Sequence, residues 1–172
     1  MEFRRCGQPL RVEKNSTPPD RQSSAHNGRV RPTYPAAVYL CLFDGDRILL
    51  QRRAGTGYRD GELSLPAGHI EPGESATAAL LREAREEIGL ALGPDQVRLA
   101  LVQHGRADGD AYIDFFFAAA LPAGAVPVIG EPEKASELVW APLRALPGDV
   151  IPVIRHGIEA LERGESYTEY GW

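Results

Sequence analysis

The residues with the clearest chemical potential are three glutamates near the end of one predicted helix. Glu83, Glu86 and Glu87 stand at i, i+3 and i+4, so a helix over 75–88 brings them to one face within about 5–6 Å of one another. Folding alone gives no reason for this, because like charges at this spacing cost about 0.2–0.5 kcal/mol per pair. Anions in a last helical turn also oppose the negative end of the helix dipole. A bound cation reverses both effects, so the cluster predicts a metal site.

The glutamates belong to a longer pattern that runs from a glycine-containing loop into the helix. In chain order it consists of Gly68, Glu74, the pair Arg82-Glu83, the pair Glu86-Glu87, and Gly89. This spacing resembles the Nudix box, and every fixed position of that signature is filled. The one departure is Ala84, which stands where the family usually has a larger aliphatic residue.

The resemblance implies metal-assisted hydrolysis of a phosphoanhydride bond in a nucleoside diphosphate linked to another group. Carboxylates suit a hard divalent ion, so we expect Mg²⁺, with Mn²⁺ also compatible. Such ions neutralise phosphate oxygens and lower the pKa of a bound water, whose proton a carboxylate then takes. The implied catalytic and metal-binding residues are Glu83, Glu86 and Glu87, with Glu83 the first candidate for the base. The carbonyl of Gly68 is a further implied metal contact.

The same resemblance implies roles for residues outside the glutamate cluster. Arg82 and Glu74 are similar to the structural pair of the family, in which the guanidinium fixes the loop against the helix. Arg53 resembles a phosphate-contacting arginine of MutT-like members, with an ordinary cation at a strand end as the alternative. Tyr58 is the second expected substrate contact.

The sequence leaves the roles of several further side chains undecided. Three acidic residues are candidates for a further metal ligand outside the box, and the sequence does not choose among Asp114, Glu131 and Glu133. Four aromatic residues could stack on a base, although aromatic strand residues more often belong to the core; these are Tyr58, Phe115, Phe117 and Trp140. His69 and His104 could lie near phosphates, but half-buried neutral rings are the favoured interpretation.

The elements that must position these residues follow from periodicity and turn residues. Strands are expected at 36–43, 47–53, 63–68, 97–104, 111–119 and 137–141, with a hairpin turn at 44–46 and a second turn at 105–110. Helices are expected at 75–88, where Ser75 is the N-cap and Gly89 follows the end, and at 150–163. The inner face of the first is predicted to be Leu81, Ala84 and Ile88. This order indicates layered α/β packing, which the resemblance sharpens to a Nudix fold, an α/β/α sandwich with a mixed sheet.

Length, charge and apolar content indicate how the chain is organised and which partners it has. Its 172 residues suit one domain, and we expect a flexible polar N-terminal extension at 1–33 and a Nudix hydrolase domain at 34–172. Residues 34–172 carry 12 Lys and Arg against 21 Asp and Glu, which argues against binding a nucleic-acid polymer. No apolar run approaches the roughly 20 residues of a membrane span, so we expect no membrane partner and a cytoplasmic protein. Either a monomer or a homodimer is expected.

The substrate is less well specified than the reaction. The Arg52-Arg53-Ala54 run before the box and the short loop at 57–61 look more like the MutT-type group, which favours a nucleoside triphosphate or modified nucleotide, as in house-cleaning enzymes. An ADP-ribose or nucleotide-sugar pyrophosphatase is the alternative within the family. A non-hydrolytic nucleotide-sensing domain is the alternative from another class, and retention of every box carboxylate favours the enzyme over it.

Overall fold

The computed structural model describes residues 33–172. The extension expected at 1–33 lies, apart from Thr33, outside the described residues. The strands are β1 (Ala36–Asp44), β2 (Arg47–Arg53), β3 (Leu63–Ser64), β4 (Ala67–His69), β5 (Arg98–Ala107), β6 (Asp110–Ala120), β7 (Ala135–Pro142) and β8 (Tyr167–Tyr170). The helices are α1 (Ala76–Ile88), the 3₁₀ turn η1 (Leu143–Ala145) and α2 (Pro152–Glu162).

The strands form one mixed sheet. Its main path runs β3-β2-β1-β6-β5-β8, while β4 pairs with β1 and β7 pairs with β2. The β1–β2 hairpin turns at Gly45, whose φ of 63° suits glycine. β1 is parallel to β6, and β5 is antiparallel to β6 but parallel to β8. The expected mixed sheet is therefore confirmed.

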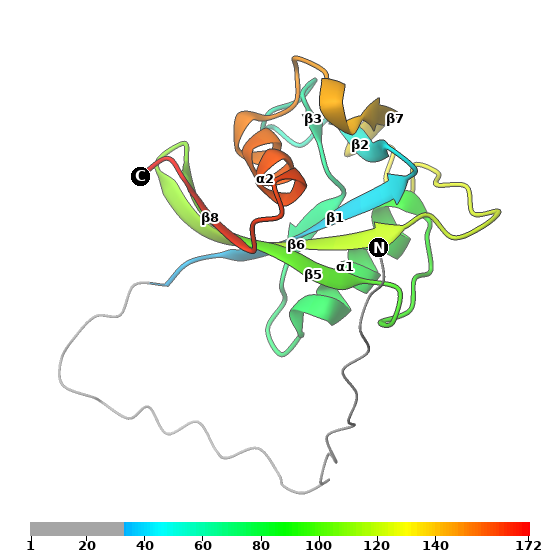
Figure 1. Ribbon diagram of the computed structural model, residues 1–172, viewed down its shortest axis with the longest axis horizontal. Coiled ribbons are helices and arrows are strands. Elements are labelled where there is room, and N and C mark those ends of the chain that lie inside the picture. Colours follow the sequence, from blue (N-terminus) through cyan, green and yellow to red (C-terminus); the bar gives the residue numbers. More distant parts are fainter. Residues whose placement is uncertain (1–32) are drawn as a thin grey trace, which may run out of the picture. The chain divides into compact units, whose positions relative to one another are not determined.

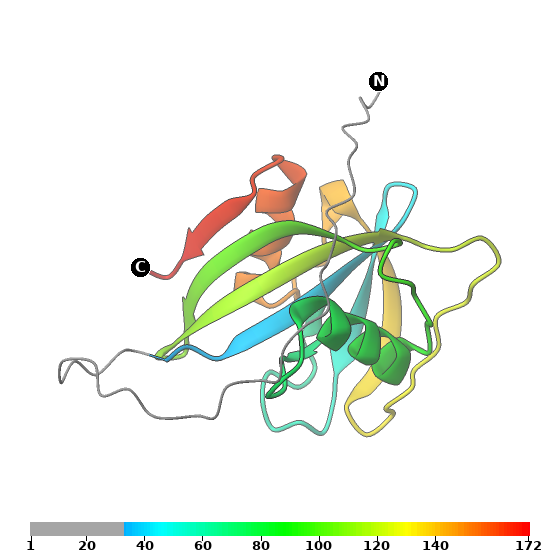
Figure 2. The same cartoon turned by 90° about the horizontal axis from the view of Figure 1, so that it is seen from below.

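The two helices cover opposite faces of the sheet (Figures 1 and 2). On one face α1 packs through Leu80 and Ile88 against side chains such as Leu40 of β1. On the other face α2 packs through Ile154 and Ile158 against a second apolar cluster. The predicted α/β/α layers are thus confirmed.

Local signals fix the ends of α1. The Ser75 hydroxyl accepts a hydrogen bond from the Ala78 amide at 3.2 Å, as an N-cap does. Gly89 adopts a left-handed conformation, and the next amide, of Leu90, donates to the Ala84 carbonyl at 3.0 Å. The predicted inner face packs against the core, with Ala84 and Ile88 buried and Leu81 partly buried, but Leu80, which was not predicted, is the more deeply buried of the two leucines.

Other boundaries also differ from expectation. The predicted turn at 105–110 is shorter, because Asp108 and Gly109, both with positive φ, make the turn alone and both strands continue to it. The expected strand at 63–68 is divided into β3 and β4. The expected second helix begins at Pro152, whose missing amide proton suits a first helical position. β8 was not predicted, and its four residues are held by pairing with β5.

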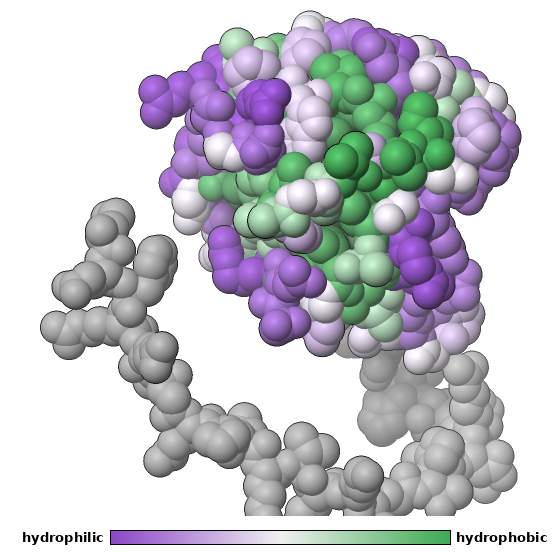
Figure 3. All heavy atoms as spheres, turned by 90° about the vertical axis from the view of Figure 1, so that its right-hand side faces the viewer, coloured by the Kyte–Doolittle hydropathy of each residue, from purple (hydrophilic) through white to green (hydrophobic). Residues whose placement is uncertain are grey.

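The surface includes a broad apolar area. Figure 3 shows apolar side chains gathered over the middle of the face seen from the right of Figure 1, with polar ones around them. In the loop between β6 and β7, Val126 and Val128 are exposed. Within residues 33–172, no helix has the length and apolar character that crossing a membrane requires.

Candidate functional site

A cavity of about 1010 Å³ opens beside α1 and extends to the start of α2. We distinguish two sides by their lining residues. The carboxylate side consists of Gly68, Glu83, Glu86, Glu87, Glu133 and Lys134. The apolar side consists of Tyr39, Gly105, Asp114, Ile151, Val153 and Ile154. The segment before α2 is held beside β3, since the Ile151 amide donates to the Leu63 carbonyl at 3.0 Å.

Glu83 lies directly against the backbone of β4. A Cβ placed on Gly68 would stand 1.9 Å from Glu83 Oε1, far inside van der Waals contact. Glycine is therefore required at position 68 while Glu83 keeps this orientation. Burial raises the pKa of Glu83, an effect that its hydrogen bond to Arg82 opposes.

Glu87 is the most deeply placed of the three glutamates. Its Oε2 accepts hydrogen bonds from the Ala67 amide at 2.7 Å and from Gln51 Nε2 at 3.0 Å. Burial, together with the charge of Glu83, raises its pKa to about 7. Gln51 on β2 had no predicted role, because a glutamine beside the two arginines at the end of a strand belongs to no recognised motif. Its other amide atom, Oε1, is buried without a hydrogen-bond partner.

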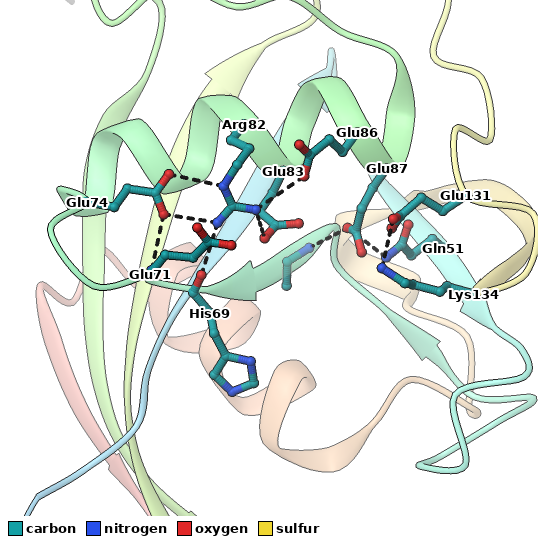
Figure 4. A network of polar contacts seen from close by, with 11 residues as sticks. Gln51, His69, Glu71, Glu74, Arg82, Glu83, Glu86, Glu87, Glu131 and Lys134 are labelled. Atoms are coloured by element: carbon teal, nitrogen blue, oxygen red, sulfur yellow. Dashed lines mark hydrogen bonds and ion pairs between the residues drawn. The ribbon is translucent and has the colours of Figure 1, made fainter.

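Arg82 organises the loop before α1 (Figure 4). Its Nε and Nη2 each donate to one carboxylate oxygen of Glu74 at 3.0 Å, which lowers the pKa of Glu74. Nη2 also donates to the His69 carbonyl at 3.1 Å. This is the contact expected of the predicted structural pair, because it ties the loop and β4 to the helix. Nη1 donates to Glu83 at 2.5 Å and to Glu86 at 3.2 Å.

The donor set on the carboxylate side suits a divalent cation. The charge of Glu83 raises the pKa of Glu87, the charge of Glu86 raises the pKa of Glu83, and the charge of Glu131 raises the pKa of both Glu83 and Glu87. A cation among them would offset the repulsion, and oxygen donors are those that Mg²⁺ prefers. Among residues 33–172, however, no group of three His, Cys, Asp or Glu side chains already stands in a metal-holding arrangement. Glu83 and Glu86 instead share the guanidinium of Arg82.

Comparison with known proteins identifies the family of the chain. A family profile described as "NUDIX domain" matches residues 33–161. The chain belongs to the NUDIX domain family. Hydrolases of this family generally need a divalent metal ion.

Individual relatives of this NUDIX chain were found among curated proteins and solved structures. It is 34% identical over 113 residues to "8-oxo-dGDP phosphatase NUDT18" of Homo sapiens, covering 64% of this chain and 33% of that protein. It is 39% identical over 61 residues to "ADP compounds hydrolase NudE" of Escherichia coli, covering 36% and 33%. These matches span about a third of each relative's length. A MutT NUDIX hydrolase structure from Burkholderia pseudomallei superposes with a TM-score of 0.66 at 26% identity, covering 74% of this chain and 98% of that one.

The two predicted substrate contacts lie together on the wall of the NUDIX pocket. Arg53 donates through Nε to the Tyr58 carbonyl at 2.8 Å, and its guanidinium lies 5.5 Å from the centre of the Tyr58 ring. The Tyr58 hydroxyl donates to Asp108 in the β5–β6 turn at 2.8 Å, and Arg59 pairs with the same carboxylate at 3.1 Å. The loop that carries Tyr58 is thereby fastened to the β5–β6 hairpin.

The three acidic candidates outside the box occupy different places. Glu131 is paired with Lys134 at 2.7 Å and influences the pKa values of Glu83 and Glu87, so it lies near the carboxylate side. Glu133 lines the pocket there. Asp114 belongs to the apolar side, on the α2 face of β6.

The structure also places the aromatic and histidine candidates. Trp140 packs against the apolar cluster beneath α1, with the Arg47 guanidinium 5.7 Å from its ring centre. Phe115 and Phe117 pack against the same cluster. His69 lines the pocket. His104 instead packs against Tyr34 and Trp172, with ring centres 5.3 Å and 4.5 Å away respectively.

Proposed function

We propose that this NUDIX chain is a hydrolase that requires Mg²⁺, with Mn²⁺ as a substitute, and cleaves a phosphoanhydride bond of a small nucleotide. The observation that carries the proposal is the placement of Glu83 and Glu87, two carboxylates with raised pKa values, in one cavity of about 1010 Å³ that also has the apolar side. A nucleotide has the matching division, since its phosphates are charged and its base is flat and largely apolar.

The proposed metal ligands are Glu83, Glu86, Glu87 and the Gly68 carbonyl. A divalent ion bound there would neutralise phosphate charge and activate a water. Glu86 is exposed, so it can leave Arg82 at little cost. Gln51 and the Ala67 amide orient the Glu87 carboxylate through its Oε2.

Glu83 is the proposed general base. Its carboxylate is the proposed acceptor of the proton that the attacking water loses. Arg82 and the close approach to Gly68 hold its carboxylate in one orientation. Arg53 and Lys134 are the proposed contacts to phosphate oxygens, because both line the pocket.

The preferred substrate is a nucleoside triphosphate or a modified nucleotide. The human relative named as an 8-oxo-dGDP phosphatase supports the modified-nucleotide class. The relative named as an ADP compounds hydrolase supports the second candidate, an ADP-ribose or nucleotide-sugar pyrophosphatase. Cytoplasmic location, monomeric or homodimeric assembly and the lack of polymer and membrane partners stay predictions.

A substrate panel tests the proposal. Full-length protein is incubated with deoxynucleoside triphosphates, 8-oxo-dGDP, ADP-ribose and a nucleotide sugar in Mg²⁺, Mn²⁺ or excess chelator, and released phosphate and nucleoside monophosphate are measured. We expect metal-dependent turnover of at least one compound, highest among the triphosphates and modified nucleotides. Binding of these compounds without any turnover would support the non-hydrolytic sensor instead.

A further inference from the structure

Asp114 is a buried carboxylate for which the proposed reaction has no use. It lies on β6, is only 4% exposed, and lines the pocket on its apolar side. Gln103 Nε2 is 3.4 Å from its Oδ2, a long hydrogen bond, and that same Nε2 also donates to the Val153 carbonyl at 3.3 Å. A buried carboxylate normally accepts several good hydrogen bonds. Asp114 therefore has acceptor capacity left on the side that faces the cavity.

The lack of a side chain at Gly105 keeps the space in front of the Asp114 carboxylate open. A Cβ on Gly105 would stand 3.4 Å from Asp114 Oδ2 and 3.6 Å from Val153 Cγ2, so a larger residue there would fill the space in front of the carboxylate. The Tyr39 ring, which stacks on Phe116 with centres 4.9 Å apart, belongs to the same wall. Apolar walls around one well-placed polar group are typical of a small-molecule site.

We propose that Asp114 selects a guanine-type base by accepting hydrogen bonds from its N1–H and 2-amino groups. This inference rests on the proposed function, because it assumes that the ligand is a nucleotide. An ionised carboxylate only accepts hydrogen bonds, through two oxygens that can each take one. Guanine presents two adjacent donors on one edge. Adenine and cytosine present a donor beside an acceptor, and uracil and thymine present one donor between two acceptors.

The burial of Asp114 makes the discrimination between guanine and other bases strong. Burial raises the pKa of Asp114 to about 6, so near pH 7.5 the group is mostly ionised and acceptor-only. With a mismatched base in the pocket, a buried oxygen faces another acceptor and neither finds a partner, which costs more than a hydrogen bond lost to water. The guanine edge is the same in guanine and 8-oxoguanine, so the proposal applies to both.

The test compares three nucleotides and three proteins. We measure kcat and KM of the full chain for dGTP, dITP and dATP in Mg²⁺, with wild type, Asp114→Asn and the control Asp110→Asn, which makes the same change at an exposed position of the same strand. Hypoxanthine keeps N1–H but lacks the 2-amino group, so dITP should be about tenfold poorer than dGTP. The asparagine amide matches adenine better, so the dGTP to dATP ratio of kcat/KM should fall at least about tenfold in Asp114→Asn, mainly through KM. Asp110→Asn should keep the wild-type ratio.

A further variant tests whether misfolding could explain a change in nucleotide preference. Gly105→Ala leaves Asp114 in place but narrows the space before it, and should raise KM for dGTP without changing kcat. Equal use of dGTP and dATP by wild type, or the same ratio in Asp114→Asn, would overturn the inference. An equal loss for all three nucleotides together with a higher Mg²⁺ requirement would also overturn it, since Asp114 would then be a metal ligand.

The two proposals fail in different ways. If no compound of the substrate panel is hydrolysed, the proposed function fails, and base selection is then measured by calorimetric binding of dGDP and dADP in Mg²⁺. A guanine preference in wild type that Asp114→Asn loses would still support the inference. Equal binding of the two diphosphates would refute it.

Discussion

The backbone of Gly68 and the carboxylate of Glu83 are in such close contact that no Cβ fits between them: a Cβ on Gly68 would stand 1.9 Å from Glu83 Oε1. The loop glycine and the helix glutamate, fifteen positions apart, therefore act as one unit. Their spacing in the sequence reflects a packing requirement as well as a chemical one.

Gly68→Ala should displace the Glu83 carboxylate and lower kcat by roughly 10²-fold, the loss typical of a misplacement of about 1 Å at a reacting centre. Gly148→Ala is the matched control, because a Cβ there meets no heavy atom within 4 Å. Steady-state kinetics and thermal melts of both variants make the comparison. Wild-type kcat in Gly68→Ala would show that the orientation of Glu83 does not matter for the reaction.

Gln51→Leu removes the side-chain donor to Glu87 while keeping a similar volume. Loss of a group that orients a metal ligand typically costs about 10- to 100-fold in metal affinity or activity. We therefore expect the Mg²⁺ concentration for half-maximal activity to rise by that order while the melting temperature stays close to wild type. An unchanged Mg²⁺ requirement would remove Gln51 from the site.

Arg82→Lys keeps the charge but loses the two-point contact with Glu74, because an ammonium group cannot present two parallel donors. Activity should fall by about 10- to 100-fold through loss of the loop position. Arg85→Lys, at an exposed position of the same helix, should behave as wild type. Equal activity of the two variants would contradict a positioning role for Arg82.

Asp114 should make stability depend on pH. Its pKa is raised from 3.8 to about 6, so the native state holds this proton more tightly than the unfolded state does. The cost of ionising it is absent below about pH 3.8, grows as pH rises toward about 6 and is constant above, where it reaches roughly 3 kcal/mol. Asp114→Asn should therefore raise the free energy of unfolding in urea by up to that amount near pH 7.5 and by clearly less near pH 4.5. An equal difference at both pH values would mean that the charge of Asp114 is not the cause.

Local chemistry made much of the fold predictable. The turn at Gly45, the cap at Ser75 and the left-handed Gly89 each act within a few residues, so their signals lie in short stretches of sequence. The glutamate cluster was visible for the same reason, since helical spacing alone brings Glu83 and Glu87 together. Features that depend on contacts between distant parts of the chain were not visible: β8 depends on pairing with β5, and the burial of Leu80 depends on the cluster that α1 forms with the sheet.

The same distinction applies to the candidate site. Gln51 reaches Glu87 only because β2, β4 and α1 meet, and nothing near it in the sequence marks that meeting. Asp114 was one of three equivalent acidic candidates until the sheet placed it on the α2 face, apart from the other two. Trp140 looked available for stacking, but it packs against the core under α1.

Direct measurement of kcat/KM for the best nucleotide substrate in Mg²⁺, with Glu87→Gln beside wild type, tests the central claim that the box carboxylates carry the hydrolysis. Glu162→Gln, the same change at an exposed position of α2, is the control. We predict a loss of roughly 10²–10⁴-fold in Glu87→Gln and none in Glu162→Gln, with both variants folded. Metal-dependent turnover by Glu87→Gln at the wild-type rate would contradict the account.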